Sequence, residues 1–496
     1  MRNMKKANMN RGKEFIIWCD KAMAFSFYAL IYFLPISIAL SEIFTGLALL
    51  FYLLKRLVSF CVIVGEKAKE KSTLSFLHYF ILFFRSFRPV DSYLNKPILI
   101  LLSFSLISVF VSRYPMLSIK GFFGKVLQSA FLYFNFIECI NSKKRLKKFF
   151  IVFLISATLI SINGLYQYFM GKDFIHGHLI RNGRISSSFR ADNDFAAYLV
   201  VVVPILLNFS LLNTINGIKK FSGIYVKKDV FSPFLSGNPG KAWIFIVFIL
   251  SFICLGLTFS RGAWVAFALV MFIFSVRKKR YIIINGLILI LFFGLFYPRL
   301  QETRQVSLIV DSVREKGDTR QAPDVNGEKQ GTAVSASVQK KTGILETYKE
   351  MLKLGWIWGG SGRSEYWKEA IHIIKDYPFF GVGLNTYSVV GRGYKITWGG
   401  YPHNCYLQMA AETGILGLLS FLWLSGVLFY RSFRNLAAMQ DPFLAMFLFG
   451  SLIGLGGFLT HSFFDTNFYS VQLGSFMWLI MGLIVAIQKV EKDLLQ

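Results

Sequence analysis

Residues 242–259, "AWIFIVFILSFICLGLTF", decide the fold class of this chain. The run is too long for a β-strand and too apolar for a helix with one face in water. It fits a helix that crosses a bilayer, which needs about 20 apolar residues. The whole chain agrees, because 54% of its 496 residues are hydrophobic and 53 are Phe. We therefore predict an all-α polytopic membrane protein, and not a soluble protein with a core of buried strands.

Other apolar runs lead us to predict about twelve transmembrane helices. Residues 22–40 and 42–54 have basic residues beyond both ends of the pair, which favours a tight hairpin; one long tilted helix is the alternative. A basic amphipathic stretch at 73–88 follows, and we expect it on the cytoplasmic face. The remaining spans are predicted at 96–112, 120–140, 149–169, 192–212, 241–259, 262–276, 281–297, 407–430, 442–461 and 469–488.

The net charge of +28 resides in Lys and Arg residues that cluster just beyond apolar runs. Such clusters mark cytoplasmic loops, so this charge indicates membrane topology and no nucleic-acid partner. All five basic loops fall on one side, which predicts that both termini are cytoplasmic. The basic N-terminus with its apolar run indicates a retained span and no cleaved signal. The basic loops are at 55–71, 143–148, 213–228, 277–280 and 431–434, and the predicted exterior segments are 170–191, 298–403 and 462–468.

One exterior segment is much longer than the others and divides the chain. We predict an N-terminal membrane region at 1–297 with about nine spans, a large loop at 298–403, and a C-terminal membrane region at 404–496 with about three. Within the loop, 311–343 is polar and poor in large apolar residues, which predicts a mobile stretch. By contrast, 355–403 carries helix signals and is expected to form a folded lid.

The helix expected in this lid begins near Ser361 or Ser364, either of which can cap it. Pro378 ends it. Its apolar stripe is predicted to be Trp367, Ala370, Ile371 and Ile374.

The five cysteines are scattered, without a CxxC pair or a Cys/His cluster of metal spacing. This pattern predicts neither a disulfide framework nor a zinc site. No acidic pair of metal-binding type is evident in the exterior segments, so we expect no metal and no cofactor.

Two arginines occupy positions where a charge is costly. Arg261 lies between two apolar runs, either in a tight exterior turn from which it snorkels to lipid head groups, or facing a cavity that binds an anion. Arg363 follows glycines and precedes a helix start, where free N–H groups favour an anion; a plain flexible loop is the alternative.

His403 precedes a span, where it could hydrogen-bond locally or act as a general base. Asn404 could orient it or hold a substrate hydroxyl. His461 and Asp465 are four residues apart and share a face if that segment is helical. They could bind sugar hydroxyls, position an imidazole ring or cap a helix.

Arg190, with Asp192, Asn193 and Asp194 nearby, marks a further candidate contact at the start of a span. An ordinary capped helix start is the alternative. The predicted topology places all of these residues on the outer side. Two arginines would neutralise a diphosphate leaving group, and a histidine would take a proton from an attacking hydroxyl. The set therefore suits a phosphorylated lipid substrate.

Four stretches resemble the O-antigen ligase and polymerase superfamily of bacterial envelope glycan assembly. The similar region runs from about 240 to 465 and, with the predicted topology, makes the resemblance specific. The stretches are "LTFSRGAWVA" (257–266), "SGRSEYWKEAIHIIKDYPFFGVGLNTY" (361–387), "HNCYLQMAAETGILGLLSFL" (403–422) and "THSFFD" (460–465).

The resemblance implies a helical fold similar to the GT-C glycosyltransferases, with one large periplasmic loop. It implies a metal-independent transfer of a glycan from undecaprenyl diphosphate at the periplasmic face of the inner membrane. The acceptor would be a sugar hydroxyl of lipid A–core, which makes the protein a ligase. A lipid-linked repeat, as in a polymerase, and a protein, as in an O-oligosaccharyltransferase, are the alternatives. Arg261 and Arg363 would bind the diphosphate, and His403 would activate the acceptor.

A transporter of lipid-linked glycan is the candidate from a different class. Such proteins more often show internal repeats and charges buried inside the bundle. No repeat is evident here, and the costly polar residues gather at one face, which favours an enzyme.

Overall fold

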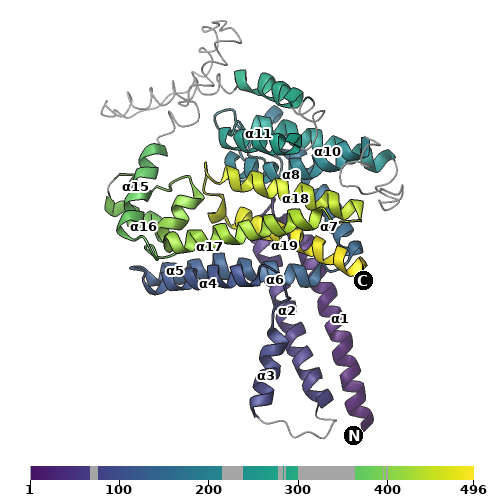
Figure 1. Cartoon of the computed structure of the whole chain (residues 1–496). Coiled ribbons are helices and arrows are strands. Elements are labelled where there is room, and N and C mark those ends of the chain that lie inside the picture. Colours follow the sequence, from purple (N-terminus) through teal and green to yellow (C-terminus); the bar gives the residue numbers. More distant parts are fainter. Residues whose placement is uncertain are drawn as a thin grey trace, which may run out of the picture.

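The computed structural model describes residues 2–67, 76–214, 238–276, 283, 286–299, 363–394, 396–397 and 400–495. Within these residues the chain forms helices and no strand, with two isolated β-bridges (Figure 1). The helices are α1 (Arg2–Phe33), α2 (Ile38–Lys67), α3 (Phe76–Phe87), α4 (Asn95–Phe110), α5 (Pro115–Gly121), η2 (Phe122–Leu127), α6 (Gln128–Cys139), α7 (Lys143–Met170), α8 (Asp192–Thr214), α10 (Asn238–Leu257), α11 (Arg261–Val276), α15 (Arg363–Asp376), α16 (Tyr387–Tyr394), α17 (Cys405–Leu436), α18 (Pro442–His461), η4 (Asn467–Tyr469) and α19 (Val471–Leu495).

Eight of the described helices are long and apolar enough to cross a membrane: α1, α2, α7, α8, α10, α17, α18 and α19. Shorter apolar helices are α4, the first part of α11 and 286–299. Each predicted span overlaps a helix, and α5, η2 and α6 run end to end through the one predicted at 120–140. The protein is therefore a multi-pass membrane protein, while the count of twelve spans stays a prediction.

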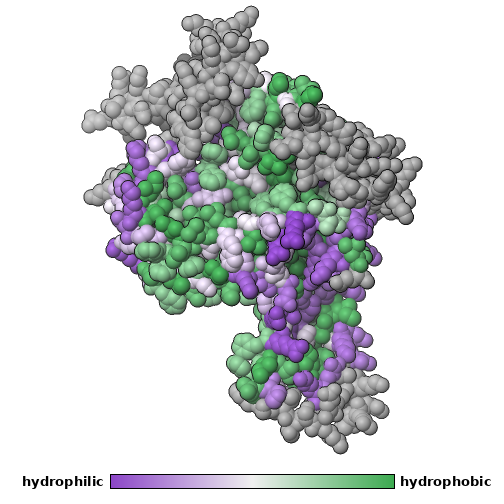
Figure 2. Space-filling view, in the orientation of Figure 1, coloured by the Kyte–Doolittle hydropathy of each residue, from purple (hydrophilic) through white to green (hydrophobic). Residues whose placement is uncertain are grey.

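The surface has the hydropathy expected of a lipid-facing bundle. Figure 2 shows apolar surface over α4 and α17, with hydrophilic surface at α15 and α16 and again beside the C-terminus. Exposed apolar residues on α4 and α17 include Leu99, Phe110, Leu419 and Trp423. Apolar side chains are compatible with lipid tails, so this band is the surface that we expect to face the bilayer.

The first two helices form the predicted hairpin, and a single long helix is excluded. Residues 34–37 make the turn between α1 and α2, ahead of the predicted break at residue 41. Pro35 lies in this turn; it has no N–H to donate and disfavours a helical conformation in the preceding residue. The N-terminal part of α1, the C-terminal part of α2, and α3 project from the helical body (Figure 1).

The centre of the body is α8, which packs against α18, α10 and α11. Gly450 and Gly454 lie one turn apart on α18 and allow its backbone to approach α8. A Cβ at Gly454 would lie 2.8 Å from the carbonyl oxygen of Val201. This spacing is the small-residue motif that lets membrane helices pack closely.

One end of the bundle, which we call the basic end, is held by ion pairs. Lys55 Nζ lies 3.0 Å from Asp20 Oδ1 and 2.9 Å from Glu138 Oε1. Arg145 pairs with the second oxygen of Asp20. The four side chains are half-buried and connect α1, α2, α6 and α7. A connected network of this kind fixes helix ends better than isolated surface pairs do.

The opposite end, which we call the lid end, brings together segments that are far apart in sequence. They are the turn 34–37, the loop 171–191, the turn 258–260, the start of α17 and the loop 462–470. Gln472 Nε2 donates to the Leu34 carbonyl at 2.8 Å, and Cys405 N–H donates to the Ser462 carbonyl at 2.9 Å. The loop 171–191 joins through Ile185 N–H, which donates to the Leu257 carbonyl at 3.3 Å.

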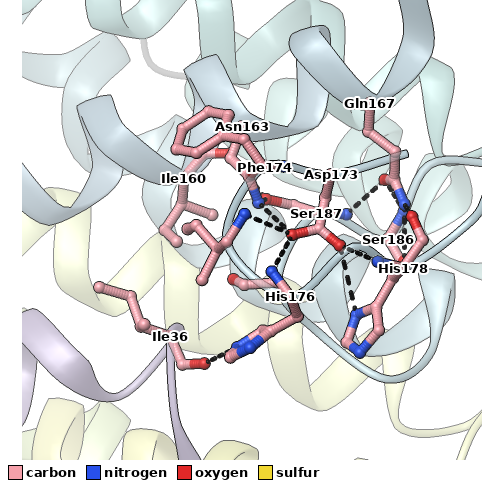
Figure 3. Close-up of polar contacts among 12 residues, drawn as sticks. Ile36, Ile160, Asn163, Gln167, Asp173, Phe174, His176, His178, Ser186 and Ser187 are labelled. Atoms are coloured by element: carbon pink, nitrogen blue, oxygen red, sulfur yellow. Dashed lines mark hydrogen bonds and ion pairs between the residues drawn. The ribbon is translucent and has the colours of Figure 1, made fainter. Parts of the chain in front are cut away.

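The loop 171–191 is organised by a buried carboxylate (Figure 3). Asp173 Oδ1 accepts backbone hydrogen bonds from Ile175 at 2.9 Å and His176 at 2.8 Å. The His176 side chain donates to the Ile36 carbonyl at 2.7 Å, which ties the loop to the α1–α2 turn. Gln167 Oε1 accepts from two successive backbone N–H groups at 186–187. The loop is therefore a fixed support for the residues that follow it.

The lid comprises α15, the turn 377–386 and α16, which are described parts of the predicted segment 355–403. As predicted, the first lid helix ends just before Pro378. The predicted mobile stretch at 311–343 lies outside the described residues.

The buried face of α15 differs from the predicted stripe. Ile371 is 43% exposed, so its assignment to the stripe is wrong. The helix rests on α17 through a neighbouring face made by Glu369, Ala370 and Ile373. Ser364 lies inside α15 and cannot cap it; Ser361 lies outside the described residues.

Glu412 of α17 anchors the lid. Its buried carboxylate accepts hydrogen bonds from the backbone N–H of Asn385 at 2.8 Å and of Tyr387 at 3.3 Å. Gly414, at φ 75°, breaks the regular path of α17 here, and a Cβ on it would lie 2.0 Å from the Phe379 carbonyl oxygen. The break thus admits the lid turn to the side of a membrane helix.

We expect Glu412→Ala to loosen the lid, because it leaves two lid N–H groups without their acceptor, at about 1–3 kcal/mol each. Thermal unfolding of the detergent-solubilised protein, together with limited proteolysis across 363–403, would measure this. Glu365→Ala is the matched control, since Glu365 is exposed and pairs only with Lys368 among the described residues. Equal melting temperatures and cleavage rates for the two variants would refute the anchor.

Candidate functional site

His403 and Asp465 form a hydrogen-bonded pair at the lid end. His403 Nδ1 lies 3.3 Å from Asp465 Oδ1, and the His403 side chain is 41% exposed. Since a carboxylate only accepts, Nδ1 carries the proton and donates it to Asp465. In the neutral ring, the other nitrogen, Nε2, is then the proton acceptor.

The backbone fixes this histidine in an uncommon conformation. His403 has φ 45°, in the left-handed region. Asn404, directly after it, caps α17: its side-chain oxygen accepts from the N–H groups of Tyr406 at 3.0 Å and Leu407 at 3.1 Å. The amide oxygen of Asn404 is therefore used in helix capping, and the capped start holds His403 at the rim of the bundle.

Asp465 is ionised at neutral pH. Burial alone would raise the pKa of its carboxyl, but the hydrogen bond with His403 and the nearby imidazoles of His461 and His403 hold it lower, at about 2. Because this pKa lies below the ordinary value of 3.8, the pairing stabilises the fold above that pH and is lost as the pH falls towards 2. The carboxylate can therefore hold the imidazole tautomer and stabilise a positive ring.

The lid contributes two residues from one face of α15. Arg363 and Tyr366 are three residues apart and so lie on the same side of the helix. Tyr366 packs edge-to-face on His403, with ring centroids 5.7 Å apart. Burial lowers the pKa of the Arg363 guanidinium, which Asp465 partly offsets and the like charge of Arg184 reinforces. Arginine stays protonated in proteins, so Arg363 brings a positive charge to this site.

Arg184 is a third cation of the site that the sequence reasoning missed. Its Nε donates to the Thr258 carbonyl at 2.8 Å, and its terminal nitrogen donates to Asn193 Oδ1 at 3.0 Å and pairs with Asp192. The available signal was Asn182–Gly183, a dipeptide typical of a two-residue hairpin turn. Both turn residues have positive φ, and Arg184 lies directly after them.

Arg261 is the first residue of α11, directly after the turn 258–260, and is half-buried. The preceding residue, Ser260, is buried and its Oγ lies 3.3 Å from His461 Nε2. His461 is only 1% exposed, and its Nδ1 lies 3.0 Å from Asn467 Nδ2. In this geometry His461 ties the start of α11 to the end of α18 and has no surface for a substrate.

The condition for a shared helix face of His461 and Asp465 is not met, because α18 ends at His461 and the next residues turn. The two side chains nevertheless interact electrostatically. Arg190 is exposed beside the start of α8. Among the described residues, no three His, Cys, Asp or Glu side chains gather as metal ligands.

The arrangement combines a proton acceptor with two arginines, Arg363 and Arg184, and Arg184 is paired with Asp192. The His403 side chain is partly exposed, and Arg363 comes close enough to Asp465 and Arg184 for their charges to interact. One guanidinium group can donate two parallel hydrogen bonds to phosphate oxygens, and its charge stabilises negative charge on a leaving group. The site is therefore suited to proton abstraction beside a bound anion.

The comparisons with known proteins support one family. Residues 246–422 match the family model described as O-antigen ligase. The match spans the segments that carry Arg261, Arg363 and His403, and it ends before Asp465. No curated protein matches the chain. The family match supports the predicted resemblance of this multi-pass membrane protein to the O-antigen ligase superfamily.

Proposed function

We propose that the protein is a glycosyltransferase that moves a glycan from undecaprenyl diphosphate to a sugar hydroxyl of lipid A–core. The reaction would take place at the periplasmic face of the inner membrane, with both termini in the cytoplasm. The observation that carries the proposal is the exposed His403, whose Nδ1 is held by Asp465 beside converging arginines. The O-antigen ligase description of the matched family favours a ligase over a polymerase.

In the proposed reaction, His403 Nε2 accepts the proton of the acceptor hydroxyl while the hydroxyl oxygen attacks the anomeric carbon. The bond from that carbon to the diphosphate breaks, and the undecaprenyl diphosphate leaves with the bonding electron pair. Arg261 and Arg363 neutralise the departing group, and Arg184 adds its charge next to Arg363. Asp465 stabilises the imidazolium until its proton passes to water.

Deletion of the gene tests the acceptor. We expect lipopolysaccharide without any O-chain, restored by the wild-type gene. Lipopolysaccharide with a single repeat would instead identify a polymerase, and unchanged lipopolysaccharide with unglycosylated proteins would identify protein transfer. A purified protein that leaves the lipid-linked glycan chemically intact while moving it across vesicles would identify a transporter.

His403→Ala should lower the transfer rate of the purified protein about 10²–10⁴-fold, the usual contribution of a general base. Asp465→Asn should also slow transfer, because an amide holds the ring without stabilising its positive charge. The matched control is His372→Ala, on the lid but outside the pair. Turnover by His403→Ala equal to that of the control would eliminate the general-base role.

Arg261→Ala and Arg363→Ala should each lower kcat by about 10²–10³-fold if these residues stabilise the leaving diphosphate, as measured for single donors to a developing anion. Arg392→Ala, an exposed arginine of α16, removes the same charge elsewhere on the lid and serves as control. Initial rates against donor concentration separate weaker binding from a higher barrier. If Arg261→Ala changes neither KM nor kcat, Arg261 only anchors the chain in the head-group region.

A further inference from the structure

A groove of about 390 Å³ lies at the basic end, far from His403 along the bundle. It is lined by Lys143, Lys144, Lys147, Lys148 and Ile151, all on the first turns of α7. The first and third of these lysines are half-buried, and the other two are exposed. Four lysine side chains therefore line one open, shallow groove. The arginine between them points elsewhere, to Asp20 and the Cys139 carbonyl.

The protein supplies little negative charge to this groove. Within the described part of the chain, Asp441 at the start of α18 is the carboxylate that pairs with the cluster, through Lys143. Glu491 also lies nearby, and it accepts from the backbone N–H groups of Gln440 and Asp441. Three lysines make no ion pair with the described residues, and like charges four apart on a helix repel each other.

The groove also has apolar surface. Ile151 continues its wall into the membrane-spanning part of α7. The Phe443 ring lies 5.9 Å below Lys147 Nζ. A small soluble anion would use only the lysines. An anion attached to an acyl chain would use both kinds of surface.

We propose that this groove binds an acidic phospholipid of the adjacent leaflet, with its phosphates on the lysines and an acyl chain along Ile151. Basic pockets at the ends of membrane helices are suited to such head groups. Three lysines without an ion pair among the described residues match a head group with two phosphates better than one with a single phosphate. The occupant is therefore of the diphosphatidylglycerol type, and its binding does not depend on the transfer reaction.

Native mass spectrometry of the full-length, delipidated protein tests this proposal with three probes: diphosphatidylglycerol, phosphatidylglycerol and phosphatidylethanolamine. We expect affinity to fall in that order. The double variant Lys144→Gln/Lys148→Gln keeps the Lys143–Asp441 pair and should bind diphosphatidylglycerol about tenfold or more weakly, as two surface lysines contribute in binding acidic lipid. Lys489→Gln/Lys492→Gln removes equal charge from α19 at the same end and should bind as the wild type does.

An equal loss of affinity for diphosphatidylglycerol in the two double variants would show that binding follows net charge. That result would overturn the proposed site. Unchanged affinity in Lys144→Gln/Lys148→Gln would overturn it as well. Full competition by inorganic phosphate at concentrations similar to those of the lipid would reject a lipid occupant. Glycan transfer is not the readout, so none of these outcomes depends on the proposed function.

Discussion

The buried carboxylate of Glu412 is the contact on which the placement of the lid depends. A charge inside a membrane bundle is costly unless polar partners surround it. Here the partners are backbone N–H groups of the lid, at Asn385 and Tyr387, together with the Gln408 amide at 3.2 Å. If the lid moved away, the buried carboxylate would lose two of its hydrogen-bond donors. The free-energy cost of leaving that carboxylate without donors therefore holds the lid on α17.

The His403–Asp465 pair depends on a second constraint, the junction between the start of α17 and the loop after α18. The Cys405 thiol donates to the Asp465 carbonyl at 3.2 Å and accepts from Phe468 N–H at 3.3 Å. Cys405 N–H also binds the Ser462 carbonyl. Three hydrogen bonds from one buried residue therefore fix the two loops that carry the pair, so its geometry does not rely on the side chains alone.

Sequence reasoning located the helices well, because each apolar run is long and the thickness of a bilayer limits the length that a spanning helix can have. It placed His403, Arg261 and Arg363 on one side because basic clusters constrain topology. It missed Arg184, which lies in a loop without apolar periodicity. It also could not show that α18 ends at His461, because an apolar pattern does not mark the last residue of a helix. Sequence reasoning also did not predict the buried face of α15 correctly. That face is set by contact with α17, and Glu369 is buried there through hydrogen bonds from Thr397.

The cations of the site come from three separate supports, and this separation has a physical reason. Guanidinium groups repel one another, so a single flexible loop carrying all of them would splay apart. Arg184 is instead held by Asn193 and Asp192, Arg261 by its place at the start of α11, and Arg363 by α15. Folding therefore holds the three guanidinium groups in place, which is the electrostatic preorganisation that the proposed diphosphate site requires. Because Arg363 belongs to the lid, the charge of the site is complete only while the lid rests on Glu412.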